Sequence, residues 1–270
     1  MVASQNMKIV LHKNKPIGKV LFIVEGTKTE PYILKKIFTQ IFDYELDTKI
    51  RGKKYKQYNS KTDPFSRICV INTKESNIKY IQKDDGYLDN LFSELIDQYD
   101  FDIDNAAIYY IFDRDDKSNT DSEFIYNLLL RLINSRDNPN YDKQGLLLLS
   151  YPSIESFTLS CFSDNTTSIR VKTGQDLKNY LDTQKINHQK IEKDTLLHAA
   201  DEMLRNLGII NGDDFELNLD DLSECNINVF SFEEKELTKS GLYRCMSLFL
   251  ICLLDLGLIE ILPADYSDTN

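Results

Sequence analysis

The sequence contains no long run of uncharged apolar residues, and its first residues, MVASQNMKIVLHKNK, lack the apolar segment of a signal peptide. A membrane-spanning helix needs about 20 apolar residues in succession. We therefore expect a cytoplasmic protein that does not cross a membrane. At 270 residues, of which 41% are hydrophobic and only six are proline, the chain can still bury one large core or two smaller ones.

Cysteine, histidine and glycine patterns exclude several kinds of chemistry. The five cysteines are scattered and form no CxxC pair, which argues against both a disulfide framework and a zinc site. The three histidines stand alone and lie in no motif, so a histidine-based hydrolase is not indicated. No glycine-rich loop of the Walker type occurs, and the chain is not expected to hydrolyse ATP by itself.

Positive charge is scarce overall, since the net charge is -11, but it is concentrated near the start of the chain. Residues 1–75 carry 15 Lys and Arg against 7 Asp and Glu, whereas the rest of the chain is strongly acidic. The basic density peaks in residues 49–61, KIRGKKYKQYNSK, where tyrosines interleave with the cations. Such a segment could follow a phosphate backbone while Tyr55 and Tyr58 stack on bases, or it could be a solvated hairpin or loop. The candidate nucleic-acid contacts are Lys49, Arg51, Lys53, Lys54, Tyr55 and Lys56.

A strand, a turn and a helix are predicted around Glu25. Residues 20–24 form a short apolar run, the glycine after Glu25 breaks it, and the apolar spacing of residues 33–41 predicts an amphipathic helix. Thr29 is expected to cap this helix, with Pro31 in its first turn. Glu25 therefore lies at the edge of the sheet where α/β folds place their ligands.

Strand and helix alternate through the first part of the chain. Further apolar strands are predicted at 67–72, 106–112 and 146–150, with helices at 87–99, 123–135 and 154–162, and Thr120 or Asp121 is expected to cap the second of these helices. This order favours a parallel sheet with right-handed crossovers. From about residue 166 the pattern predicts helices only, at 174–183, 194–207 and 233–258. The last of these is apolar on nearly every side, so it is expected to be buried in the protein's own core or in a partner interface.

Three carboxylates are expected to meet at one edge of this sheet. Glu25 follows the first strand, while Asp113 and Asp115 follow the strand at 106–112 with a spacing that lets both point the same way. Carboxylates placed together repel one another unless a cation lies among them. Mg²⁺ fits this need because it takes oxygen ligands and completes its shell with water and substrate phosphate. Phosphoryl chemistry is the natural expectation.

These blocks resemble a known family. FIVEG at 22–26 and IFDRDD at 111–116, in this order, resemble the toprim domain of topoisomerases, bacterial-type primases and several nucleases. The sequence is most similar to the RloB-like and overcoming-lysogenization-defect-like branch, which shares EGTKTEP at 25–31, FDRDD at 112–116 and PSIE at 152–155. The resemblance covers roughly residues 18–162. It implies a Rossmann-like parallel sheet flanked by helices at 1–165, with the basic segment inserted at 49–61 and a helical C-terminal region at 166–270.

The resemblance also implies roles for particular residues. Glu25, Asp113 and Asp115 would bind one or two Mg²⁺ ions, with Mn²⁺ as an alternative, and Glu155 would be a further ligand. Glu30 and Asp116 would support these ligands, while a capping, turn or surface role remains open for each acid. Lys28 lies in the same turn as Glu25 and either holds the scissile phosphate or is simply exposed.

We therefore expect a metal-dependent nuclease that hydrolyses phosphodiester bonds, since a topoisomerase or primase would need further domains that the sequence does not offer. The resemblance implies a toxic effector of anti-phage defence that cuts RNA, preferably tRNA, rather than DNA. It further implies an ATPase partner that holds the effector inactive and a homodimer as the active form. The alternatives are a toprim module that binds nucleic acid or a partner without catalysis, and a nuclease of RNA maturation.

Overall fold

The computed structural model describes residues 7–47, 55–72, 78–81, 90, 92–97, 101, 103, 105–115, 119–137, 145–212 and 215–263. These residues form an α/β fold with a mixed, largely parallel central sheet flanked by helices, an arrangement compatible with a Rossmann-like fold. Among them, no helix is both long and apolar enough to cross a membrane.

Four parallel strands form the centre of the sheet, in the order β8, β6, β2, β5. They are β2 (Lys19–Val24), β5 (Arg67–Asn72), β6 (Ala106–Asp113) and β8 (Gly145–Tyr151), so all four predicted strands are confirmed. Nearly all of their side chains are buried. Parallel strands covered on both faces are expected to be apolar throughout, which is why these segments are continuous apolar runs in the sequence.

The four predicted strands pair in parallel as expected. The edges of the sheet carry further, antiparallel strands that the sequence did not predict. On one side β5 pairs with β4 (Tyr55–Ser60), which pairs in turn with β3 (Tyr44–Leu46). On the other side β8 pairs with β7 (Ile133–Asn134) and β11 (Met246–Ser247). The connection from β4 to β5 is too short for a crossover, so the chain can only return antiparallel.

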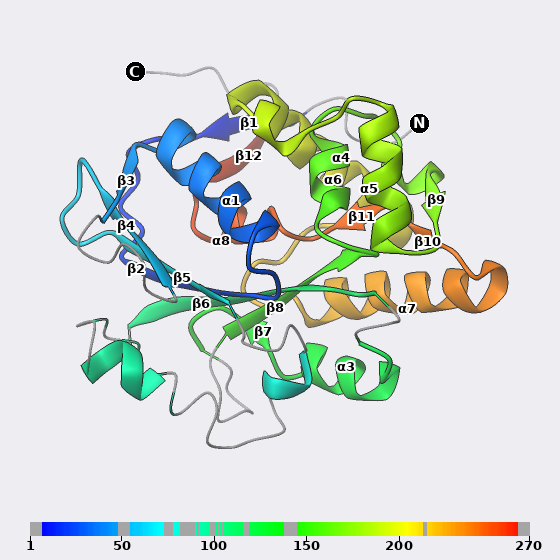
Figure 1. Cartoon of the computed structure of the whole chain (residues 1–270), viewed down its shortest axis with the longest axis horizontal. Coiled ribbons are helices and arrows are strands. Elements are labelled where there is room, and N and C mark those ends of the chain that lie inside the picture. Colours follow the sequence, from blue (N-terminus) through cyan, green and yellow to red (C-terminus); the bar gives the residue numbers. More distant parts are fainter. Residues whose placement is uncertain are drawn as a thin grey trace.

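Helices cover both faces of the sheet, and Figure 1 shows α1, α4 and α5 on one side and α3 and α7 on the other. The helical segments at 174–183 and 194–207 are confirmed as α5 and α6, and the described residues 92–97 are helical as predicted. The helical elements are α1 (Thr29–Lys36), the π-helix η2 (Ile37–Ile41), the short η4 (Ile78–Ile81), α3 (Ser122–Leu129), α4 (Glu155–Ser160), η5 (Thr166–Ser168), α5 (Gly174–Thr183), η6 (His188–Lys190), α6 (Lys193–Asn211), α7 (Ser223–Ser240) and α8 (Ile251–Asp255).

The prediction of a purely helical region at 166–270 is wrong. The helix expected at 233–258 ends at Gly241, whose left-handed backbone (φ 69°) terminates α7. The chain then forms β10 (Tyr243–Arg244), β11 and the short α8 before β12 (Ile259–Pro263). Strand β10 pairs with β9 (Arg170–Val171). Strands of two residues carry no periodicity that could distinguish them from a helix in the sequence.

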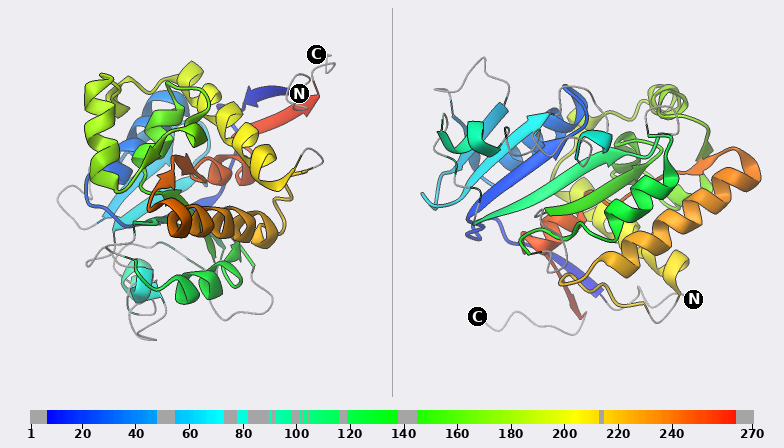
Figure 2. Two further views of the ribbon diagram at one scale, coloured as in Figure 1. Left: turned by 90° about the vertical axis from the view of Figure 1, so that its right-hand side faces the viewer. Right: turned by 90° about the horizontal axis from the view of Figure 1, so that it is seen from below.

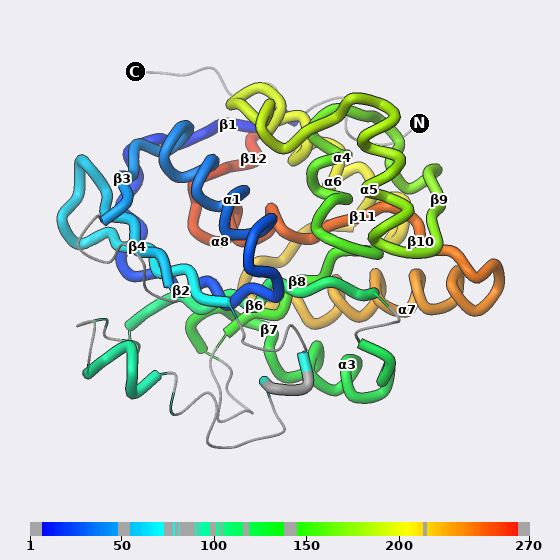
Figure 3. The backbone as a smooth tube through the Cα atoms, in the orientation of Figure 1, coloured from blue at the N-terminus to red at the C-terminus, as the bar shows by residue number. Residues whose placement is uncertain are grey.

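Both ends of the described chain meet in one small sheet. Strand β1 (Met7–Leu11) pairs antiparallel with β12, and Figures 2 and 3 show the first and last coloured segments side by side. Residues from both predicted parts, from Ile17 to Ile259, belong to one continuous hydrophobic core. The C-terminal residues are therefore an integral part of the packing around the central sheet.

Candidate active site

The candidate site lies where β2, β6 and β8 end. These strands run in parallel register, with Val24 opposite Ile111 and Asp113 opposite Ser150. Glu25 extends the ladder by one residue, since its amide donates to the Ile111 carbonyl at 3.1 Å. Glu25 and Asp113 are thereby fixed on neighbouring strands at the carboxyl edge of the sheet, as the sequence predicts.

Glu25 and Asp113 are in direct contact. The Asp113 amide donates to Glu25 Oε2 at 2.9 Å, and Asp113 Oδ1 accepts from the Ile154 amide at 2.8 Å. The second contact places the carboxylate of Asp113 at the start of α4, next to Glu155. Glu25 and Glu155 are only 8% and 6% exposed. Glu25 thus accepts a hydrogen bond from the backbone of Asp113. Glu155 directly follows Ile154, whose amide donates to the Asp113 carboxylate.

Glu30 closes the turn that carries Glu25. Its Oε1 accepts from the Gly26 amide at 2.7 Å, so the carboxylate folds back on the turn. A Cβ atom on Gly26 would lie 2.3 Å from Glu30 Oε2, which explains why glycine occupies this position. The supporting role predicted for Glu30 is consistent with this contact. Thr29 does not cap α1, because it is the first residue of the helix and the N-cap residue is Lys28.

Glu155 connects the site to the C-terminal part of the chain. Ser153 Oγ donates to Glu155 Oε2 at 2.8 Å, and Lys178 Nζ lies 3.5 Å from Glu155 Oε1. Lys178 belongs to α5, whose first residue, Gly174, approaches both the site loop and the carboxylate of Asp115. A Cβ on Gly174 would lie 3.0 Å from Ser153 Oγ and 3.9 Å from Asp115 Oδ2. Helix α5 therefore forms one wall of the site.

The carboxylates raise each other's proton affinity. Burial raises the pKa of Glu25 to about 7, hydrogen bonds from Asp113 and Asn119 oppose the rise, and the charges of Glu30 and Asp115 add to it. The pKa of Asp113 is raised well above its usual value, first by burial and then by the charges of Glu25, Glu30 and Glu155. Burial likewise raises the pKa of Glu30, and the charge of Glu155 contributes. The acids therefore share one electrostatic site.

The donor chemistry of this site fits a hard cation. All its candidate ligands are carboxylate oxygens, which Mg²⁺ prefers, and their mutual repulsion would be relieved by a bound cation. Within the described ranges, no three His, Cys, Asp or Glu side chains form a ready-made metal-binding group. One oxygen of Glu25 and one of Asp113 already accept backbone hydrogen bonds, so these bonds orient the two carboxylates.

Apart from Tyr55, the remaining predicted site residues are either exposed or outside the described residues. The side chain of Lys28 is exposed in the turn before α1. Asp116 and the basic residues Lys49, Arg51, Lys53 and Lys54 lie outside the described residues.

Stacking of bases on Tyr55 and Tyr58 is a wrong prediction, because both side chains are buried, at 2% and 1% exposure. The segment from Tyr55 is strand β4 rather than a loop, and its tyrosines pack into the core. The side chain of Lys56, between them, is exposed. Of the predicted basic contacts that the structure describes, Lys56 is thus the one that can reach a ligand.

Two residues that interact with Glu155 were not predicted from the sequence. Lys178 and His188 come from the C-terminal part of the chain, where they read as ordinary polar positions. The His188 ring packs against Tyr32 of α1 at 4.9 Å between centroids. Burial lowers the pKa of His188, and the charges of Glu155 and Lys36 act on it in opposite directions. No signal in the sequence relates these residues to Glu155, because only the folded chain brings them together.

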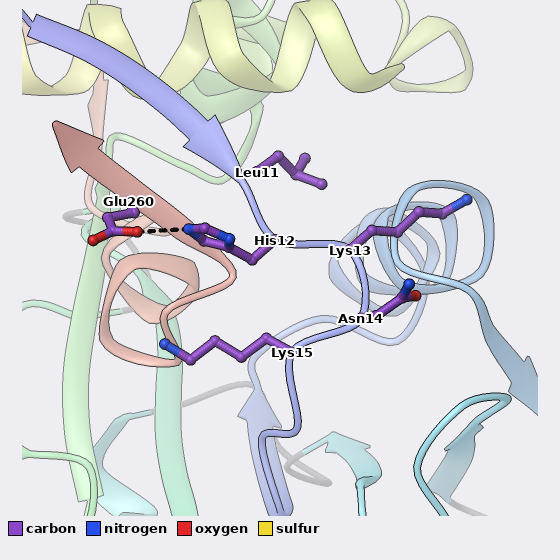
Figure 4. Close-up of a pocket in the computed structure, with 6 residues that line it drawn as sticks. All are labelled: Leu11, His12, Lys13, Asn14, Lys15 and Glu260. Carbon is purple, nitrogen blue, oxygen red and sulfur yellow. Dashed lines mark hydrogen bonds and ion pairs between the residues drawn. The ribbon is translucent and has the colours of Figure 1, made fainter. Parts of the chain in front are cut away.

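A hollow on the surface lies away from this site. Figure 4 shows its lining, in which His12 Nε2 contacts Glu260 Oε2 at 2.6 Å and Lys13 and Lys15 flank the loop. Residues 11–15 of this lining precede the amino end of β2 and Glu260 lies in β12, whereas Glu25 follows the carboxyl end of β2. The hollow therefore contributes nothing to the acidic site.

Fold and site together define an α/β protein with a buried acidic cluster at the carboxyl edge of a largely parallel sheet. Comparison of the chain with models of known families, with curated proteins and with solved structures gave no match.

Proposed function

We propose that this protein is a Mg²⁺-dependent nuclease of the toprim type that hydrolyses phosphodiester bonds in nucleic acid. The observation that carries the proposal is the contact between Glu25 and Asp113 at the carboxyl edge of the sheet, with Asp115 and Glu155 in the same electrostatic site. Burying acids together is unfavourable, so such a cluster is an unusual feature for a purely structural edge. The toprim resemblance of the same residues in the sequence supports the proposal.

Different residues of the site would bind the cation and orient its ligands. Glu25, Asp113, Asp115 and Glu155 would hold the cation, and the backbone amides of Asp113 and Ile154 would keep two of these carboxylates oriented. A bound Mg²⁺ would polarise the scissile phosphate and activate a water molecule.

Lys178 is a candidate to act on the substrate, because it pairs with Glu155 of this cluster. Its side chain is half exposed, so it can turn from the carboxylate towards a phosphate oxygen. It would then balance negative charge on the phosphate during cleavage. Lys28, exposed in the neighbouring turn, is the second candidate for this role.

RNA, preferably tRNA, is the proposed substrate, and a toxic role in anti-phage defence with an ATPase partner and an active homodimer is the proposed context. These features are supported by the resemblance in sequence alone. The exposed Lys56 and the basic residues before it would contact the substrate backbone.

The test is to incubate the purified protein with total cellular RNA, plasmid and single-stranded DNA, with Mg²⁺, Mn²⁺ or a chelator. Glu25→Gln and Asp113→Asn serve as site variants, and Glu45→Gln, an exposed acid on β3, is the matched control. We expect metal-dependent cleavage of RNA by the wild type and the control, and none by the site variants. Cleavage that persists in both site variants, or in the chelator, would contradict the proposal. Binding of nucleic acid without any cleavage would favour the non-catalytic toprim module.

A further inference from the structure

Arg114 lies between two of the proposed ligands but points away from them, into the protein. It is only 2% exposed, although it follows Asp113 and precedes Asp115 at the edge of the sheet. Its Nη1 donates to the Asn119 carbonyl at 2.7 Å, and its Nη2 donates to Ser122 Oγ at 2.8 Å. The guanidinium therefore links the end of β6 to Asn119 and to the first residue of α3.

The partner of this buried cation comes from the C-terminal part of the chain. Glu234 of α7 places Oε1 2.7 Å from Arg114 Nη2, and its Oε2 accepts from Ser122 Oγ at 2.7 Å. Phe230, one turn earlier on α7, lies beneath the guanidinium at 5.6 Å. Figure 1 shows α3 and α7 on the same face of the sheet, where these contacts form. A planar guanidinium is suited to bind several acceptors at once in fixed directions.

From Arg114 the contacts lead directly to the acids. Asn119 is fully buried, and its Nδ2 donates to the Asp113 carbonyl at 2.8 Å. The Asn119 side chain also hydrogen-bonds Glu25 and lowers its pKa. Its Oδ1 accepts from the Ile78 amide at 3.2 Å, which fixes the amide group in one orientation. A continuous set of contacts thus joins Glu234 to Arg114, Arg114 to Asn119, and Asn119 to Asp113 and Glu25.

We propose that Arg114 is a positioning residue for the acidic site and that Glu234 anchors it to α7. Helix α7 then sets the geometry of the carboxylates, although it lies on the far side of the sheet from α1, α4 and α5. The proposal rests on the proposed function only for the chemical role of the acids. The contacts that position the acids belong to the fold, and their effect can be measured without any substrate.

The decisive measurement is amide hydrogen exchange by NMR in the presence of a chelator. The reporters are the amides of Asp113 and Ile154, which bind Glu25 and Asp113, and the amides of β5 serve as an internal reference for global opening. The variant is Glu234→Gln, which keeps the shape and a hydrogen-bonding group but removes the charge opposite Arg114. Glu236→Gln is the matched control, since Glu236 lies on the same helix and pairs with Arg170 and Arg244 instead.

We expect exchange at Asp113 and Ile154 to become at least about tenfold faster in Glu234→Gln, with β5 unchanged, because a buried cation without its partner no longer fixes Asn119 and Ser122. Arg114→Lys should show the same local effect, since an ammonium cannot bind Asn119, Ser122 and Glu234 in one plane. Glu236→Gln should match the wild type at both reporters. Reporter exchange in Glu234→Gln equal to that of the control would overturn the proposal.

A second readout separates this proposal from the proposed function. The concentration of Mn²⁺ that half-saturates thermal stabilisation should rise about tenfold in Glu234→Gln and stay unchanged in Glu236→Gln. Faster local exchange in Glu234→Gln, combined with a wild type that neither binds Mn²⁺ nor cuts nucleic acid, would refute the nuclease while leaving the positioning role intact. Unchanged exchange beside a fully active wild type would refute the positioning role alone.

Discussion

Replacing Glu25 by glutamine should stabilise the metal-free protein at alkaline pH and change little at acid pH. Burial raises the pKa of Glu25 from 4.5 to about 7, with added repulsion from Glu30 and Asp115. Below about pH 4.5 the carboxyl is neutral in both the folded and the unfolded chain. As the pH rises further, the unfolded chain releases this proton first, so the free energy of unfolding falls until about pH 7. The shift corresponds to about 3 kcal/mol at about 1.36 kcal/mol per pH unit.

Urea unfolding in a chelator at about pH 5 and about pH 8 measures this effect. The free energy of unfolding of Glu25→Gln, relative to the wild type, should rise by about 2 to 3 kcal/mol between these pH values. Glutamine can still accept the hydrogen bond from the Asp113 amide, so the comparison isolates the charge. Glu233, whose pKa is raised to about 8 by burial, titrates in both proteins and cancels in the difference.

Glu45→Gln, at an exposed acid, should show no such dependence on pH. If the free energy of unfolding of Glu25→Gln exceeds that of the wild type by the same amount at both pH values, the reasoning is refuted. Such a result would mean that ionising the carboxylate costs no free energy in the folded protein.

Three further changes test other parts of the structure. Addition of Mg²⁺ should raise the melting temperature of the wild type more at about pH 8 than at about pH 5, because Glu25 must lose its proton to bind a cation, and Glu25→Gln should lose this gain. Gly26→Ala should destabilise by about 1 to 3 kcal/mol in urea unfolding, and Glu30→Ala in the same chain should relieve the clash. Lys178→Met should change stability by less than about 1 kcal/mol but reduce cleavage more than about tenfold; equal activity would contradict its role at the site.

The central strands were predictable from the sequence because their position in the fold imposes a pattern. A strand covered on both faces must be apolar throughout, and the runs at β2 and β6 meet this requirement. The C-terminal part carries no comparable pattern, since β10 and β11 are two residues long and α8 five. Strand β10 pairs with β9 and β11 pairs with β8, and these partners are far apart in the sequence.

The candidate site was predictable only in part, for a related reason. Parallel strands bring their carboxyl ends to one edge, so the proximity of Glu25 and Asp113 follows from topology alone. The burial of Arg114 could not be predicted, because in the sequence a buried arginine between acidic residues looks the same as an exposed one. Tyr55 was wrongly predicted to be exposed, because lysines surround it in the sequence. In the structure, strand β4 directs its ring into the core.

Glu25 and Asp113, at the acidic edge of the sheet, are held by groups that do not neutralise them. Glu25 and Asp113 are oriented by backbone amides, and Arg114, the buried cation that follows Asp113 in the chain, is engaged with Glu234 instead. The repulsion among the acids therefore stays in the folded protein and is expressed as raised pKa values. A fold that only needed stability could have relieved this repulsion by turning Arg114 outward or by placing an amide at Glu25. Arg114 instead points inward, and position 25 carries a carboxylate. Both observations favour a site that is completed by a cation from outside the chain.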